Sequence, residues 1–209
     1  VVERMRQEGI LADTKDISAY LNDAGESEHK SKRLLQQFTK LERYILNNIP
    51  DDVLRISCKQ LNDNAQKEGI TSATEKDIRT LLYFLTIKGY TRKKEDAAHN
   101  IEVVRQADLD TIIKRFEKRL AICQFAVEWL FSQTLSSAVE EEKKRGVQFS
   151  IVELLNDIKK SSNLFCSLQD VQLEDVEEAL LYLSKIGALK LEGGFLVLYN
   201  AMDIRRIKD

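Results

Sequence analysis

Proline, glycine and cysteine are all scarce in this 209-residue sequence. It contains one Pro (Pro50), eight Gly and three Cys. So few turn-forming residues disfavour a many-stranded sandwich and favour helices. The three cysteines, Cys58, Cys123 and Cys166, are odd in number and lack CxxC spacing, which favours reduced thiols over disulfides or a zinc site.

Long apolar runs are missing as well. No run approaches the roughly 18 residues that a membrane span needs, and no cleavable signal precedes the first periodic segment. We therefore expect a cytoplasmic protein without a membrane partner. Because the sequence begins Val1-Val2 without an initiator Met, we also expect it to be a piece of a longer protein.

Recognisable catalytic motifs are absent too. There is no GxxxxGK[ST] phosphate loop, and the two histidines, His29 and His99, are too far apart to predict a triad or a zinc helix. Asp96-Ala97-Ala98-His99 has the form of a DExH box, but the charged run 92–95 precedes it instead of a buried strand. We expect no catalytic residue, no metal and no cofactor in these 209 residues.

The first half of the chain predicts helix, strand, helix, helix and hairpin in that order. Apolar residues recur at helical spacing from Leu34 to Ile49, and Val53–Ile56 has the composition of a short strand. Ser57-Cys58-Lys59-Gln60 has the form of a capping box, and a helix begins near Thr74 and ends at Gly89. Two short extended runs, 90–94 and 101–104, complete the hairpin.

The second half repeats that order. A helix of about seven turns is predicted from Leu109 to Leu135, then a strand at 147–149 and a second capping box at Ser150. Residues 77–89 align without gaps on residues 175–187, with four identities, and Gly193-Gly194 predicts a hairpin between 188–191 and 195–199.

The expected fold is mostly α with small β-hairpins (α+β), as tandem winged-helix modules joined by a long helix. Residues 1–30 would be a helical linker following a missing upstream domain. Residues 31–107 would form module 1, and residues 108–209 the long helix plus module 2.

Charge differs between the two modules. Residues 36–105 hold 12 Lys/Arg against 10 Asp/Glu, whereas 147–209 hold 7 against 10. In a winged helix the third helix usually enters the major groove and the wing straddles phosphates. Module 1 carries hydroxyls and cations at both places, so its candidate DNA-binding residues are Thr71, Ser72, Thr74, Lys76, Arg79, Lys88, Arg92, Lys93 and Lys94.

Two other surfaces bear on this assignment. Arg115, Lys118 and Arg119 could extend the basic patch or simply be solvated. The third helix of module 2 opens with Glu174 and Asp175 and no cation, which would repel phosphate. That helix is expected to be solvated or to pack against another protein.

The segment 4–20 (RMRQEGILADTKDISAY) resembles the region that follows the helicase core in large bacterial RecQ-like ATP-dependent DNA helicases. Residues 175–184 and 192–200 resemble a later part of that region. The resemblance implies a winged helix that engages duplex DNA beside an upstream helicase core, where ATP and Mg²⁺ would bind. The four-cysteine zinc module common beside RecQ winged helices is missing here.

The sequence leaves three functions open. The first is a DNA-binding accessory region of such a helicase. The second is a tandem winged-helix scaffold that makes no DNA contact and instead binds another protein or dimerises. A free transcription regulator is the third, although its reading helix is usually more basic than either one here.

Overall fold

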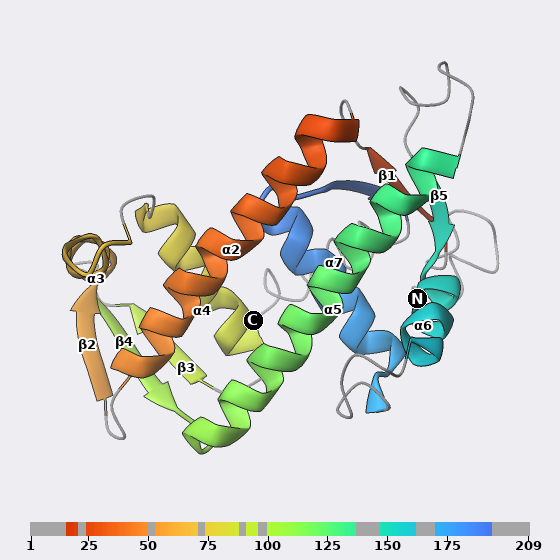
Figure 1. Cartoon of the computed structure of the whole chain (residues 1–209). Coiled ribbons are helices and arrows are strands. Elements are labelled where there is room, and N and C mark those ends of the chain that lie inside the picture. The colour runs from red at the N-terminus through yellow and green to blue at the C-terminus, as the bar shows by residue number, and fades with distance from the viewer. Residues whose placement is uncertain are drawn as a thin grey trace. The chain divides into compact units, whose positions relative to one another are not determined.

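The computed structural model describes residues 16–20, 24–49, 53–70, 74–87, 91–95, 100–136, 147–161 and 170–193 (Figure 1). The chain divides into two compact units. One, the central unit, comprises Arg33–Leu120; the other, the outer unit, comprises Val1–Lys32 together with Ala121–Asp209. Both boundaries fall within long helices, α2 (Ala24–Asn48) and α5 (Leu109–Ser136).

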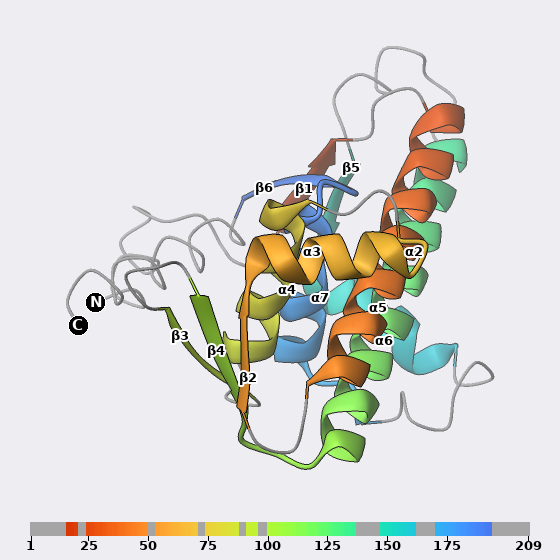
Figure 2. The ribbon, with the colours of Figure 1, turned by 90° about the vertical axis from the view of Figure 1, so that its left-hand side faces the viewer.

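The central unit places a small sheet beside helices. After α2 come β2 (Val53–Ser57), α3 (Cys58–Lys67), α4 (Glu75–Ile87), β3 (Thr91–Glu95) and β4 (Asn100–Arg105). The three strands form an antiparallel sheet in the order β2-β4-β3, which Figure 2 shows with α3 and α4 nearby. α3 contacts α4 and β2, and α4 contacts β3.

Apolar periodicity explains why these segments are helices. Most of the predicted apolar stripe is buried, from Leu35 on α2 to Ile49 just after it, and α3 and α4 bury their apolar positions in the same way. The buried side chains of the central unit include Leu35, Phe38, Leu41, Ile45, Leu46, Leu61, Ala65, Ile78, Leu81, Leu82, Phe84, Leu85, Val103, Ile112 and Phe116. Burial of that apolar surface is the main force that holds the unit together.

Polar side chains fix where the helices begin. The Ser57 hydroxyl accepts the amide N–H of Gln60 at 3.0 Å at the start of α3, as the sequence predicts. At the start of α5, one Asp108 carboxylate oxygen accepts the amide of Thr111 at 2.9 Å and the other accepts its hydroxyl at 2.6 Å. These hydrogen bonds hold the pKa of Asp108 below its ordinary value.

The outer unit contains β1 (Asp16–Tyr20), β5 (Val147–Ser150), α6 (Ile151–Lys160), α7 (Leu173–Lys185) and β6 (Lys190–Gly193). Its strands form an antiparallel sheet in the order β5-β1-β6. The Ser150 hydroxyl caps α6 by accepting the amide of Val152 at 3.2 Å, one residue earlier than the expected capping box implies. Gly187, after α7, has a φ of +77°, the left-handed conformation expected at a helix end.

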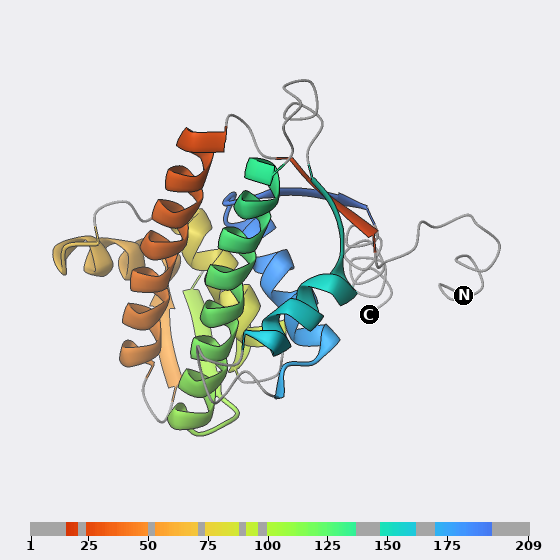
Figure 3. The same cartoon turned by 45° about the vertical axis from the view of Figure 1, so that its right-hand side comes forward.

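Packing in the outer unit again follows the apolar stripes. The buried side chains include Ile122, Cys123, Ala126, Val127, Leu130, Phe149, Leu154, Ile158, Val176, Ala179, Leu180, Leu183 and Leu191. Trp129 on α5 donates its indole N–H to Asp157 on α6 at 2.9 Å, and its ring meets Phe149 edge-on at 5.6 Å. Figure 3 shows the two helices, α5 in green and α6 in teal. The Ser31 hydroxyl on α2 donates to the carbonyl of Ala188.

The expected α+β class, mostly helical with small antiparallel sheets, is confirmed. The expectation that residues 1–30 are helical is wrong at Asp16–Tyr20, which form β1, although α2 does begin at Ala24. The expected division into 1–30, 31–107 and 108–209 stays a prediction; the two compact units have other bounds, Arg33–Leu120 for one and Val1–Lys32 with Ala121–Asp209 for the other. None of the described helices is long and apolar enough to cross a membrane.

Candidate nucleic-acid interface

The turn between α3 and α4 uses its polar residues to start a helix. The Thr74 hydroxyl donates to a carboxylate oxygen of Asp77 at 2.8 Å, and the same oxygen accepts the Thr74 amide at 2.9 Å. In return the Asp77 amide donates to the Thr74 hydroxyl at 3.2 Å. This reciprocal arrangement is a capping box. The hydroxyl of Thr74, a candidate phosphate ligand, is therefore already occupied as a helix cap.

Two cations follow on the first turns of α4. The Lys76 side chain is exposed, whereas that of Arg79 is half-buried. The Thr80 hydroxyl donates to the Lys76 carbonyl at 3.0 Å, so α4 is regular at this point. Of the candidates on this helix, Lys76 is the best placed to reach a ligand from solvent.

The basic run Arg92-Lys93-Lys94 lies on β3. This strand forms one edge of the sheet β2-β4-β3, and its register pairs Arg92 with Val104 and Lys94 with Glu102. Because α4 contacts β3, the unit brings the helix that bears Lys76 and the strand that bears the basic run onto neighbouring elements. The remaining candidates, Thr71, Ser72 and Lys88, lie outside the described residues.

One exposed cation on this sheet is absent from the sequence-based set. Arg55 lies on β2, the opposite edge of the same sheet, with 76% of its side chain exposed. Its Nε is 3.8 Å from a carboxylate oxygen of Glu102 on the central strand. The signal in the sequence was an Arg that interrupts the apolar residues of Val53–Ile56, as expected for the solvated face of a two-sided strand.

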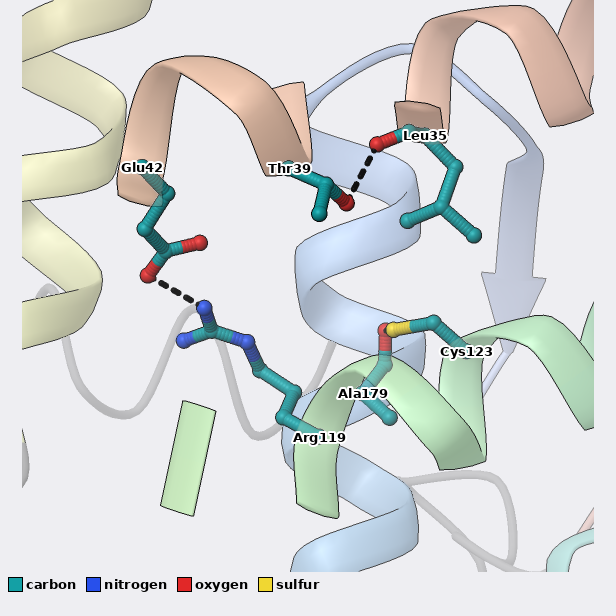
Figure 4. Close-up of polar contacts among 6 residues, drawn as sticks. All are labelled: Leu35, Thr39, Glu42, Arg119, Cys123 and Ala179. Carbon is teal, nitrogen blue, oxygen red and sulfur yellow. Dashed lines mark hydrogen bonds and ion pairs between the residues drawn. The ribbon is translucent and has the colours of Figure 1, made fainter. Parts of the chain in front are cut away.

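Arg119 does not extend the basic patch. Its guanidinium is buried in the central unit, where it donates a hydrogen bond to the buried carboxylate of Glu42 on α2 (Figure 4). It also lies 5.7 Å from the ring centre of Phe84 and 5.9 Å from that of Phe116. The suggestion that this cation faces solvent or DNA is therefore wrong.

The cysteines in the described part of the chain are structural. Cys58 and Cys123 are buried and form no disulfide, and the Cys123 thiol donates to the carbonyl of Ala179 at 3.6 Å (Figure 4). Within the same described ranges, no three His, Cys, Asp or Glu side chains come together as a metal site would require.

The acidic start of α7 has a local structural role. A carboxylate oxygen of Asp175 accepts the amide of Gln172 at 2.9 Å, which mirrors the contact between Asp77 and Thr74 in α4. Glu174 beside it is exposed. Carboxylates in a first turn also interact favourably with the helix dipole.

The chain was compared with protein-family models, curated proteins and solved structures. No family model, no curated protein and no solved structure matches it.

Proposed function

We propose that the chain is a non-catalytic DNA-binding accessory region of a RecQ-like ATP-dependent DNA helicase, and that the central unit is a winged helix. The observation that carries the proposal is the strand order β2-β4-β3. In a winged helix, two helices follow a first strand, and the second strand of a hairpin returns to pair with it. Here β4 returns after α3 and α4 to lie between β2 and β3, with Ser57 opposite Asn100.

The outer unit supports a tandem arrangement. α3 and α6 are each 10 residues long and each follows a strand that ends in the capping serine, Ser57 or Ser150. α4 and α7 are each 13 residues long, and their first and last residues have the same offset from one another as the gapless sequence repeat. This correspondence in element length and cap position favours two copies of one plan over a chance likeness of two amphipathic helices.

Charge favours the central unit as the copy that contacts DNA. Cations that neutralise phosphates release counterions, which supplies much of the affinity of protein for DNA. In the central unit, β3 carries Arg92, Lys93 and Lys94, and α4 opens with exposed Lys76. At the position in α7 that corresponds to Lys76 stands the exposed acid Glu174.

Charge reversal on β3 tests the proposal. If Arg92, Lys93 and Lys94 each neutralise one phosphate, together they contribute roughly −2.7 to the slope of log K against log salt. The triple substitution to Glu should remove that contribution and weaken binding to forked or duplex DNA, measured by fluorescence anisotropy at several salt concentrations.

A matched control separates a local contact from net charge. Lys30, Lys40 and Lys114 are exposed on α2 and α5, and their substitution by Glu changes the total charge by the same amount. The control should keep the wild-type salt slope. Equal DNA binding by the wild type and the β3 variant at low salt, or equal weakening of both variants, would reject the site. The chain would then be better described as a protein-binding scaffold.

A further inference from the structure

The sheet of the central unit has one buried face and one face towards solvent. Val103 on the middle strand β4 is 1% exposed, whereas its neighbour Glu102 keeps 34% of its side chain exposed. Successive residues of a strand lie on opposite faces of a sheet, so Glu102 belongs to the solvent face. Arg55 on β2 pairs with Glu102 in the register and has 76% of its side chain exposed, so it belongs to the same face.

Charges of alternating sign follow one another across this sheet. Glu102 pairs with Arg55 on one side and with Lys94 on β3 on the other, and Figure 2 shows β4 between the two edge strands. Neighbouring strands lie about 4.8 Å apart, so the backbone positions of the two cations are about 10 Å apart with the acid between them. A phosphate backbone that crosses this row meets a carboxylate between two cations.

The contact between Arg55 and Glu102 is weak. The Nε atom of Arg55 is 3.8 Å from a carboxylate oxygen of Glu102, which is close enough for an ion pair but too long for a hydrogen bond. With 76% of its side chain exposed, Arg55 is accessible to a ligand from solvent. A ligand that offers anionic oxygens at hydrogen-bonding distance therefore competes with Glu102 for this guanidinium.

The equivalent row of the outer sheet has a different composition. The two sheets align at the capping serines, Ser57 and Ser150, each of which ends an edge strand and pairs with the first residue of the middle strand. Two residues before Ser150 is Gln148, which pairs with Ser18, and Ser18 pairs in turn with Glu192. This row of Gln, Ser and Glu contains no cation. The same strand order and register therefore form without the alternating charges of the central sheet.

We propose that Arg55 is a further phosphate ligand of the DNA-binding surface, and that Glu102 limits the affinity for DNA because it competes with phosphate for Arg55. The inference rests on the proposed function, because it extends the surface formed by the basic run on β3 to the opposite edge of the same sheet. Arg55 contacts phosphate directly, whereas Glu102 acts through Arg55.

The weak geometry of the pair limits the size of the effect. Loss of an ion pair between exposed side chains changes an equilibrium by about fivefold at most. Glu102→Gln removes the charge and keeps the size of the side chain, so the affinity for DNA should rise about two- to fivefold. Arg55→Gln should lower the affinity and should reduce the magnitude of the slope of log K against log salt by about 0.9, the contribution of one phosphate contact.

A double-variant cycle in the full chain tests whether Glu102 acts through Arg55. Binding to forked or duplex DNA is measured by fluorescence anisotropy at several salt concentrations for the wild type, both single variants and the double variant. On a logarithmic scale, Glu102→Gln should raise the affinity less than half as much when Arg55 is already Gln, because the cation for which it competes is gone. Glu117→Gln, at an exposed acid on α5 of the same unit, changes the total charge equally and should leave the affinity nearly unchanged in both backgrounds.

Other results would overturn the proposal. If Glu102→Gln leaves the affinity unchanged, or raises it equally with and without Arg55, Glu102 does not compete for this cation. If Arg55→Gln leaves the salt slope unchanged, Arg55 does not bind phosphate. Arg55→Lys retains the charge and should keep the wild-type slope, whereas an equal loss in Arg55→Lys and Arg55→Gln would assign the effect to folding and reject the phosphate contact.

The variant with Glu at 92–94 separates this proposal from the proposed function. If that variant weakens DNA binding while the Arg55 and Glu102 variants behave as the wild type, only the roles of Arg55 and Glu102 are wrong. If it binds DNA as the wild type does and Arg55→Gln does so too, the sheet is not a DNA-binding surface and both proposals are rejected.

Discussion

The buried ion pair between Glu42 and Arg119 gives a sharp prediction about stability. The Glu42 side chain is fully buried and that of Arg119 is 9% exposed. Arg119→Met would remove the cation that pairs with this carboxylate, in a medium that solvates charge poorly. Removal of one member of a buried pair costs about 3–5 kcal/mol. At about 2–4 °C per kcal/mol for a chain of this size, the melting temperature should fall by roughly 6–20 °C.

The double variant Glu42→Leu with Arg119→Met should recover most of that loss. It removes both desolvation penalties and replaces the pair with apolar side chains of similar volume, a change that is often neutral or stabilising by about 1–4 kcal/mol. Urea unfolding followed by circular dichroism would measure the stability of both variants.

The exposed pair of Arg55 and Glu102 provides the control in the same unit. Its disruption by Arg55→Met should cost no more than about 1 kcal/mol, because solvent screens this pair. If the double variant is less stable than Arg119→Met, the two losses add. That result would refute the argument that the Glu42 charge, once Arg119 is removed, causes the instability.

Two further predictions concern the outer unit. The hydrogen bond from Trp129 to Asp157, and secondarily the one from Lys160, lowers the pKa of this carboxyl. The ionised Asp157 carboxylate stabilises the folded state. This stabilisation should be complete above the unfolded-state pKa of about 3.9 and should be lost as the pH falls through the lower folded-state pKa. Asp157→Asn should therefore flatten the acid side of the stability–pH profile, read from Trp129 fluorescence. Gly187→Ala should destabilise the chain by about 1–2 kcal/mol in urea unfolding, because alanine is strained at a φ of +77°. The added Cβ would meet no atom within 4 Å, so the backbone conformation alone causes the loss. An unchanged unfolding midpoint would contradict the assigned backbone conformation.

Local signals made most of the helices and hairpin strands predictable. The run from Leu109 to Leu135 keeps one apolar stripe, and the structure places α5 at Leu109–Ser136. Ser57 and Ser150 mark helix starts because a capping hydroxyl satisfies an amide only a few residues away. Such features depend on neighbours in the sequence, so one sequence contains enough information to find them.

β1 could not be found in this way. Asp-Ile-Ser-Ala-Tyr contains two residues of high strand propensity, and its partners β5 and β6 lie far away in the sequence. A five-residue strand at the centre of a sheet owes its conformation to pairing on both sides. The helical interpretation of residues 1–30 failed because it considered only the segment itself.

The sequence indicates that both charges of the buried ion pair are unusual, but it does not identify them as partners. Glu42 lies four residues after Phe38 and three residues before Ile45. Arg119 lies three residues after Phe116 and four residues before Cys123. Each charge therefore lies on the apolar stripe of its helix, where a charged side chain needs a partner. Periodicity shows that both are anomalous, but only the packing of α2 against α5 within the central unit identifies them as partners.

In the candidate site one residue was given two roles. Thr74 was assigned both to a helix start and to a phosphate contact, and its hydroxyl is used in the helix cap. Asp77 and Asp175 occupy equivalent positions and accept the equivalent amide, each at 2.9 Å. The acid at this position is therefore used in the cap of both helices, and it does not distinguish the two units.

The charge at one exposed position differs between the two units. One position before each capping aspartate, the gapless repeat places exposed Lys76 in α4 opposite exposed Glu174 in α7. This inversion occurs on helices of equal length with the same N-terminal contact, so neither helix formation nor capping requires it. In the proposed DNA complex, a phosphate backbone would therefore distinguish the two units at Lys76 and at the basic run of β3.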